Sequence, residues 1–179
     1  MDDTTVFLML VAVALAVVFL VLWAWRPRVA VVTTRDEAWV LIDGSNVMHW
    51  QDGVVALAPL TEVIGRLKEL GYVPGVVFDA NAGWKLAGRY LHDGDLARLL
   101  GLETRQVLVV PKGTQADTYL LETAREFGVR IVTNDRYRDW AVAHPEVLEP
   151  GFLIRGGMRD GTLWLQDLRP VEAAKEGAL

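Results

Sequence analysis

The sequence contains no cysteine, and this absence excludes two classes of site. Neither a disulfide framework nor a metal site with thiolate ligands can form in this chain. The absence also fits a reducing compartment. The three histidines, His49, His92 and His144, lie far apart without the spacing of metal ligands, so a zinc site is not expected.

The chain also lacks an excess of basic residues and a glycine-rich phosphate loop. Its formal net charge at pH 7 is −5, whereas nucleic-acid-binding domains usually carry a basic face. A local basic patch could be hidden in this total, or carboxylates could gather around a metal ion. A nucleotide-binding Rossmann domain is disfavoured, because no glycine-rich loop follows the first expected strand.

One long segment, Val6–Trp25 (VFLMLVAVALAVVFLVLWAW), has no charge, proline or glycine. As a helix it would measure about 30 Å, which is the hydrocarbon thickness of a bilayer. A buried core helix and a cleaved signal peptide are the alternatives. The acidic Asp2 and Asp3, and the lack of a small-residue cleavage site before Arg26, argue against a signal peptide. We therefore expect a retained transmembrane helix over residues 6–25.

The charges beside this segment predict its orientation. Residues 1–5 contain no lysine or arginine, whereas Arg26, Arg28 and Arg35 follow the segment. The positive-inside rule places the arginine side in the cytoplasm. We therefore expect a single-pass membrane protein with its N-terminus outside and its main domain cytoplasmic, as in a bacterial inner membrane.

Beyond a juxtamembrane linker at 26–37, patterns typical of strands and helices alternate. Strands are expected at 39–42, 73–78, 106–110 and 129–133, with a last strand or hairpin at 151–154 and 162–165. Helices are expected at 60–70 and 116–127, in parts of 85–100 and, as a short helix, at 136–143. This alternation predicts an α/β domain over 38–168, followed by a tail at 169–179, with a mostly parallel sheet covered by helices on both faces.

Polar residues follow each of four expected strands. They are Asp43, Ser45 and Asn46 after the first strand, Asp79 and Asn81 after the second, Asp117 after the third, and Thr133, Asn134, Asp135 and Asp139 after the fourth. Because the carboxyl ends of parallel strands meet at one edge of a sheet, we expect these carboxylates to gather there. Asp135 and Asp139 would also share a helix face if 136–143 is helical.

Carboxylates that gather in this way predict a cation. They raise each other's pKa unless a positive charge compensates, and oxygen ligands suit Mg²⁺ or Mn²⁺. Such an ion could polarise a phosphodiester and lower the pKa of an attacking water. Asp79, Asp117 or Asp139, taken alone, could instead cap a turn, favour a helix dipole or face solvent. A capping or solvent-exposed role is harder to assign to Asp43, because the apolar strand before it places it at this edge of the sheet.

Three segments are specific enough to compare with a family: LIDGSNV at 41–47, ADTYLLETA at 116–124 and IVTNDRYRDW at 131–140. They resemble the NYN branch of the PIN-like nucleases, in particular the domain of the CCCH zinc-finger (regnase-like) endoribonucleases, over roughly residues 38–155. The resemblance implies a Rossmann-like three-layer α/β/α sandwich that binds Mg²⁺ and cleaves single-stranded or stem-loop RNA. Domains of this family often act in pairs, so a homodimer is possible, but the sequence does not give the oligomeric state.

The resemblance assigns roles to residues of this chain. Metal or catalytic roles fall to Asp43, Asn46, Asp117, Asp135 and Asp139, the four aspartates being the metal ligands, with Thr133 and Asn134 in support. Substrate contacts are expected from Ser45, Asn134, Lys112, Arg136 and Arg138, with Lys85 as a further phosphate contact. Trp50 or Trp84 could stack a base, or could fill core or loop space.

The sequence departs from the family at Ala116-Asp117, which supplies one acid where the family often has two. One or two metal ions therefore remain open. The predicted function is a membrane-anchored, metal-dependent endoribonuclease, and the alternative is an inactive PIN-like domain that holds RNA or protein at the membrane. A metal-dependent adhesion domain and a haloacid-type phosphatase fit less well, because Val47 and Ser45 replace residues that those classes need.

The predicted anchor has a testable consequence. If it concentrates the nuclease on transcripts translated at the membrane, deletion of residues 1–28 should change the set of RNAs cleaved in cells. Transcript ends mapped in cells with the full-length and the shortened protein check this expectation. An unchanged set of targets would contradict it.

Overall fold

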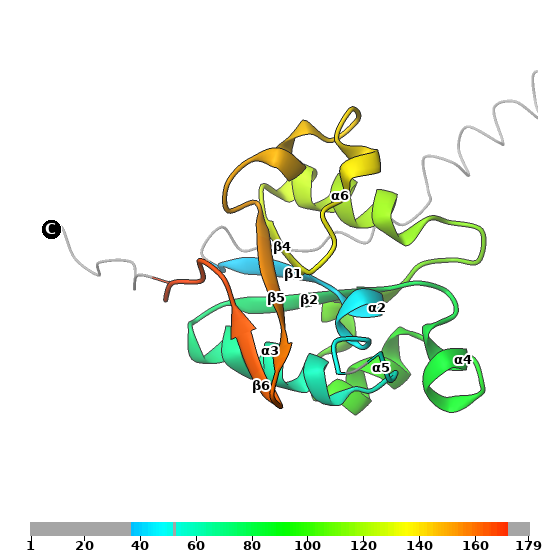
Figure 1. Cartoon of the computed structure of the whole chain (residues 1–179). Helices are drawn as coiled ribbons and strands as arrows, with labels where there is room; N and C mark the ends of the chain where they lie inside the picture. Colours follow the sequence, from blue (N-terminus) through cyan, green and yellow to red (C-terminus); the bar gives the residue numbers. More distant parts are fainter. Residues whose placement is uncertain (1–36, 52, 172–179) are drawn as a thin grey trace, which may run out of the picture. The chain divides into compact units, whose positions relative to one another are not determined.

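The computed structural model describes residues 37–51 and 53–171 (Figure 1). The expected transmembrane helix at 6–25, the linker up to residue 36 and the tail from residue 172 lie outside this range. Within the range, no helix is both long and apolar enough to cross a bilayer.

A six-stranded sheet forms the centre of the domain. Its strands are β1 (Trp39–Asp43), β2 (Val73–Phe78), β3 (Val107–Val109), β4 (Arg130–Thr133), β5 (Leu153–Arg159) and β6 (Thr162–Leu165). They lie in the order β3-β2-β1-β4-β5-β6; the first five are parallel, and β6 pairs antiparallel with β5. The expected mostly parallel sheet is confirmed, and the last two strands form the hairpin that was one of two expectations.

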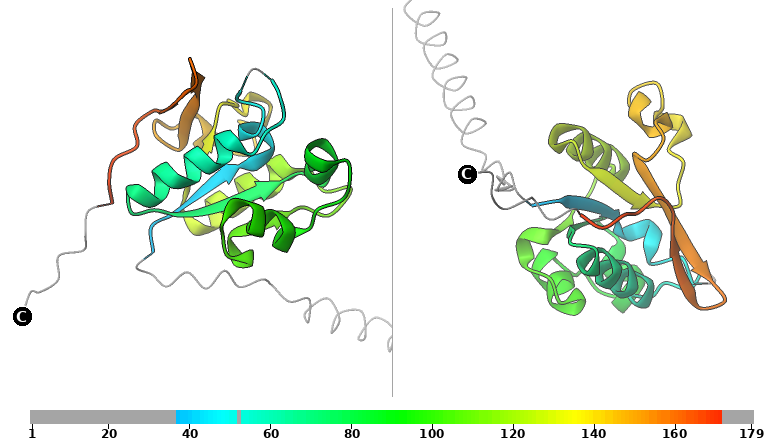
Figure 2. Two further views of the ribbon diagram at one scale, coloured as in Figure 1. Left: turned by 90° about the horizontal axis from the view of Figure 1, so that it is seen from below. Right: turned by 90° about the vertical axis from the view of Figure 1, so that its left-hand side faces the viewer.

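Helices cover both faces of the sheet, as the alternating pattern predicts (Figure 2). The α-helices are α2 (Gly44–Val47), α3 (Ala58–Glu69), α4 (Ala82–Ala87), α5 (Asp93–Leu100) and α6 (Ala116–Phe127). Short 3-10 helices are η1 (Thr104–Gln106), η2 (Arg138–Trp140) and η3 (Pro145–Leu148). In the right-hand view of Figure 2, α6 lies on one side of the sheet and α3 and α5 on the other.

Alternate residues of the strands supply two separate hydrophobic cores. In β1, Val40 and Ile42 pack with the residues of α3 and α5, whereas Leu41 packs with those of α6. Burial on both faces explains why β1 reads as a continuous apolar run rather than as an alternation. Both cores hold β1 in place, so the residue at its carboxyl end is fixed by the most buried strand of the sheet.

The expectation of a helix over 136–143 is wrong, and a local hydrogen bond explains the error. The Asp135 side chain accepts a hydrogen bond from the backbone N–H of Tyr137 (2.8 Å), a turn that competes with helix formation. Tyr137 itself has a left-handed backbone, with φ 49°. Only the three residues of η2 are helical, so Asp135 and Asp139 do not share a helix face.

The helix α2 lies so close to β2 that a side chain at its first position cannot be accommodated. A Cβ atom added to Gly44 would lie 2.7 Å from Phe78 Cε1 and 2.8 Å from Val76 Cγ1. Real Cβ atoms do not approach other heavy atoms so closely, and both neighbours are buried core residues. Glycine at this position therefore allows the chain to turn from β1 directly into α2.

We predict opposite effects for alanine at two glycines. Gly44→Ala should lower the free energy of unfolding by about 1–3 kcal/mol through overpacking. Gly65→Ala is the matched control, because Gly65 lies in α3 with nothing within 4 Å of an added Cβ; it should raise that free energy by about 0.5–1 kcal/mol. Denaturant unfolding of the two variants measures both, and equal stabilities would contradict the packing argument.

Candidate active site

The residues expected at the carboxyl edge of the sheet gather around the end of β1. The central strand β1 has β2 on one side and β4 on the other, and all three run parallel. The chain proceeds from β1 to β2 on one side and returns to β4 on the other, which makes this a topological switch point. Ligands of open α/β sheets bind at such points, beyond the carboxyl ends of the strands.

Asp43 ends β1 with its side chain almost removed from solvent, being 9% exposed. One carboxylate oxygen, Oδ1, accepts a hydrogen bond from the backbone N–H of Asn46 (3.1 Å). The other, Oδ2, accepts from the hydroxyls of Thr133 (3.2 Å) and Tyr137 (2.6 Å). Three donors from two separate segments thus converge on one buried carboxylate.

Burial raises the pKa of Asp43 to about 6, and the nearby negative charge of Asp117 adds to the rise. The hydrogen bonds from Tyr137, Asn46 and Thr133 act in the opposite direction, because they stabilise the ionised form. With a pKa of about 6, the Asp43 carboxylate gains or loses its proton close to neutral pH. Perturbed acids of this kind are characteristic of functional sites.

Tyr137 is a site residue to which the sequence assigned no role. Its side chain is 2% exposed, and burial together with the Asp43 charge raises the pKa of its phenol. The phenol therefore stays a hydrogen-bond donor to Asp43 across the physiological range. The signal was present in the YRD stretch, but nothing local shows that this tyrosine points inward through a left-handed backbone.

Asn46 connects the segments after β1 and β4. Its Oδ1 accepts hydrogen bonds from the backbone N–H of Asn134 (3.0 Å) and from the indole N–H of Trp50 (2.8 Å). Both contacts are structural, so the geometry shows Asn46 positioning the two loops. Trp50 is 7% exposed and belongs to the core, which makes the base-stacking interpretation of Trp50 wrong.

The segment after β4 is held by a chain of hydrogen bonds. The buried Thr133 hydroxyl donates to Asp43 and accepts from the backbone N–H of Asp135 (3.0 Å). The carbonyl of Asp135 in turn accepts from Arg155 (3.0 Å), a residue of β5 that the sequence did not single out. Asp135 is thereby fixed beside β1 although it lies in a loop.

Asp117 lies in the first turn of α6, which packs on the face of the sheet opposite α3 and α5. Partial burial of its carboxylate raises its pKa, and the charges of Asp135 and Asp79 raise it further, while hydrogen bonding by the Trp140 side chain lowers it. Asp117 is therefore coupled electrically to Asp43, Asp79 and Asp135. Carboxylates from four segments therefore influence one another's charge across this edge of the sheet.

Asp79 is already neutralised by its neighbours. Its carboxylate accepts hydrogen bonds from Lys85 Nζ and the Asn81 backbone N–H, and Ser45 Oγ accepts from the Asp79 backbone N–H (2.8 Å). Burial acts to raise the pKa of Asp79, but these hydrogen bonds and the Lys85 charge hold it below its usual value. Ser45 and Lys85 therefore organise the loop after β2.

The remaining expected residues lie on the outer side of the site. Asn134, Asp135, Arg136, Arg138 and Asp139 line a shallow pocket of about 490 Å³. The structure thus groups Asp139 with Asp135 and two arginines. Lys112 lies in the exposed loop between β3 and α6, and Trp84 is 58% exposed in α4.

The spacing of the acidic side chains limits how a divalent cation could bind. Among residues 37–51 and 53–171, no three acidic or histidine side chains converge closely enough to hold a metal by direct contact. Mg²⁺, however, usually keeps several waters and binds one or two carboxylates together with substrate phosphate. A cation bound in this way would favour the ionised forms of Asp43 and Asp117, whose pKa values are raised mainly by burial.

Comparison with known families identifies the domain. Residues 36–149 match the Zc3h12a-like ribonuclease NYN domain. The chain belongs to this family. The match covers the elements from β1 through η3, which contain every candidate residue discussed above except Arg155. No curated protein matches the chain.

Two solved structures share the fold. One is the crystal structure of nuclear proteinaceous RNase P 2 from A. thaliana, with a TM-score of 0.53 and 21% identity over 94% of this chain and 37% of that chain. The other is Arabidopsis thaliana nuclear protein-only RNase P 2, with a TM-score of 0.58 and 22% identity over 96% of this chain and 38% of that chain. The chain therefore spans less than two fifths of either, and the likeness shows the fold.

The buried carboxylate should make stability depend on pH. The folded pKa of Asp43 is about 6 and its ordinary value is 3.8, so the folded protein binds the proton more tightly. Its contribution to stability is complete below the ordinary value and is lost as the pH rises through about 6. The difference between the two pKa values corresponds to about 3 kcal/mol in the free energy of unfolding.

Asp43→Asn should remove this contribution. As the pH rises from about 4 to about 7, we expect the unfolding free energy of wild type to fall relative to that of Asp43→Asn. Urea unfolding in a chelator at several pH values measures it. Asp160→Asn, in the exposed turn between β5 and β6, is the control, and a difference that does not vary with pH would contradict the assignment.

Proposed function

We propose that this protein is a metal-dependent endoribonuclease that hydrolyses RNA phosphodiester bonds. The observation that carries the proposal is the buried Asp43 carboxylate, electrically coupled to Asp117 at the switch point of an NYN-family sheet. Within the described part of the chain, Asp79 has a basic partner in Lys85, whereas Asp43 forms no ion pair. Asp43 has hydroxyl and amide donors instead.

The cation we propose is Mg²⁺ or Mn²⁺, which Asp43 and Asp117 would hold together with Asp135. When bound, such an ion polarises a phosphate oxygen and lowers the pKa of the attacking water. Its charge would also offset the burial, and the weaker charge repulsion, that raise the pKa values of Asp43 and Asp117. This assignment uses oxygen ligands alone, which suits hard cations.

The protein's own residues position and protect the reacting groups. Tyr137 and Thr133 hold Asp43 Oδ2 in one orientation. Asn46 keeps the loop after β4 against α2. The exposed Asp135 at the edge of the site would serve as the general base for the attacking water. Arg136 and Arg138 beside Asp135 can contact RNA phosphate, because guanidinium groups match phosphate oxygens in geometry and charge.

A second candidate is a binding domain without catalytic activity. The observation that favours it is that no three acidic or histidine side chains of the described residues converge on one point. The single acid at Ala116-Asp117 points the same way. Such a domain would retain RNA or protein partners through the same surface and would not cut RNA with any metal ion.

The cellular setting is part of the proposal. The apolar segment at 6–25 and the arginines after it support a single membrane anchor with the nuclease domain in the cytoplasm. The RNA would be single-stranded or a stem-loop, and the active unit could be a homodimer. The domain limits of 38–168 belong to the same proposal.

Cleavage by the full-length protein tests the function. A labelled single-stranded RNA should be cut in Mg²⁺ or Mn²⁺ and remain intact in EDTA. Asp43→Asn and Asp135→Asn should each lower the rate by more than about 100-fold, because each removes a charge needed at the reacting centre. Both substitutions keep the Oδ1 acceptor that the backbone uses, so the fold should survive.

Asp160→Asn serves as the control that keeps full activity, since Asp160 lies in the exposed turn of the β5–β6 hairpin. If wild type is folded but leaves RNA uncut in every metal, and the metals do not raise its melting temperature, the binding-domain alternative holds.

A further inference from the structure

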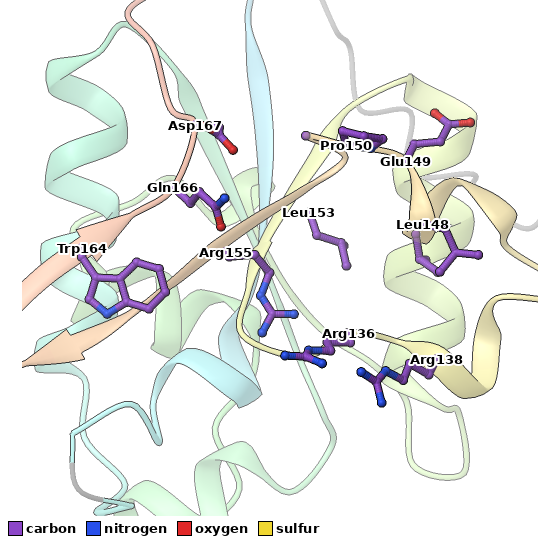
Figure 3. Close-up of a pocket in the computed structure, with 12 residues that line it drawn as sticks. Arg136, Arg138, Leu148, Glu149, Pro150, Leu153, Arg155, Trp164, Gln166 and Asp167 are labelled. Atoms are coloured by element: carbon purple, nitrogen blue, oxygen red, sulfur yellow. The ribbon is translucent and has the colours of Figure 1, made fainter.

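Three arginines meet at one end of a pocket beside the acidic residues. Arg136 and Arg138 come from the segment after β4, and Arg155 comes from β5. All three line a pocket of about 580 Å³, together with Leu148 and Trp164 among others. Figure 3 shows their guanidinium groups gathered at one end of it.

The arginine cluster lies near the carboxylate of Asp135 but forms no ion pair with it in the described part of the chain. Burial and the nearby charge of Arg136 lower the pKa of Arg155, with the charge of Asp135 acting in the opposite direction. In the described residues none of the three arginines forms an ion pair with a carboxylate. The acidic residues of the pocket, Glu149 and Asp167, lie at its opposite end in Figure 3.

The cluster adjoins the acidic residues directly. Arg155 Nη1 donates a hydrogen bond to the carbonyl of Asp135 (3.0 Å). Arg136 and Arg138 line both this pocket and the shallow one that contains Asp135 and Asp139. The two pockets therefore adjoin each other at Arg136 and Arg138.

We infer that the arginine cluster is a subsite for the phosphate of a nucleotide next to the cleaved bond, in single-stranded RNA. The inference rests on the proposed function. Repeating negative charges at fixed spacing are what a phosphodiester chain offers, and the cluster and the acidic edge are adjacent places for two successive phosphates. Planar guanidinium groups bind phosphate oxygens in pairs, so three of them define both its position and its orientation.

The pocket suits one nucleotide of an unpaired strand. Its volume of about 580 Å³ lies in the range of sites for small organic ligands, about 300–1,000 Å³. Leu148 is exposed and Trp164 is 40% exposed, and they provide apolar surface for a base or ribose. A base can reach such surface only when it is unstacked, which favours single strands over duplex.

Arg155 lies outside the part of the chain that matches the family domain. The family match ends at residue 149, whereas β5 and β6, which supply Arg155 and Trp164, follow it. The side chain of Arg155 is partly buried between the Asp135 loop and the pocket. In the inferred subsite, the hairpin therefore adds a contact for substrate beyond the acidic edge.

RNA binding by the full-length protein in EDTA tests the subsite without cleavage. Fluorescence anisotropy of a labelled single-stranded RNA is followed over a range of salt concentrations. Arg155→Gln should weaken binding about tenfold, the usual effect of losing a charge-assisted hydrogen bond. The slope of log affinity against log salt should fall in magnitude by about 0.7, because one phosphate contact to a single strand is lost.

Two further variants make the result specific. Arg138→Gln should show the same loss of affinity and salt slope, and it leaves the hydrogen bond between Arg155 and Asp135 intact. Arg66→Gln, an exposed arginine of α3 that pairs with Glu69, should bind RNA as wild type does. Thermal melting of each variant establishes that it is folded.

The outcomes separate this inference from the proposed function. Loss of affinity and slope in Arg155→Gln and Arg138→Gln alone supports the subsite, even if wild type fails to cut RNA in Mg²⁺, which would overturn only the nuclease. Wild-type cleavage with unchanged binding by both variants overturns the subsite and leaves the nuclease standing. Absence of RNA binding by wild type overturns the subsite as well.

Discussion

A carboxylate at the end of a strand buried on both faces can stay ionised only if donors replace the water it has lost. At Asp43 these donors are the N–H of Asn46 and the hydroxyls of Thr133 and Tyr137. Because these hydroxyl and amide donors do not fully offset the cost of burial, the pKa of Asp43 stays raised, at about 6. The segments after β1 and β4 supply these donors.

The parts of the fold that were predictable depend on neighbours in sequence. The apolar run that became β2 and the helical spacing that became α6 were expected at 73–78 and 116–127, the bounds that the structure has. The carboxyl edge followed in turn, because parallel strands bring Asp43, Asp79 and Asp135 together whatever the details of the loops. The apolar strand before Asp43 marked this aspartate as a candidate ligand, and in the structure its side chain also caps α2.

Other parts depend on contacts that no local pattern records. The turn made by Asp135 with Tyr137 replaces the expected helix at 136–143 and points a tyrosine inward. Trp50 was a candidate for base stacking until Asn46 and the core were seen to hold it. Arg155 joins the site only because β5 pairs beside β4, a neighbour relation that the strand pattern left open.

Both partners of Asp43 Oδ2 come from far along the chain, 90 and 94 residues away. The acid therefore has its working environment only after β4 has docked beside β1 and Tyr137 has turned inward. During synthesis, a ribosome-bound chain that has exposed Asp43 alone holds an ordinary, solvated aspartate. The proposed RNA-cleaving site is therefore complete only after most of the domain has left the ribosome. Until then, the new protein cannot cut the RNA from which it is being translated.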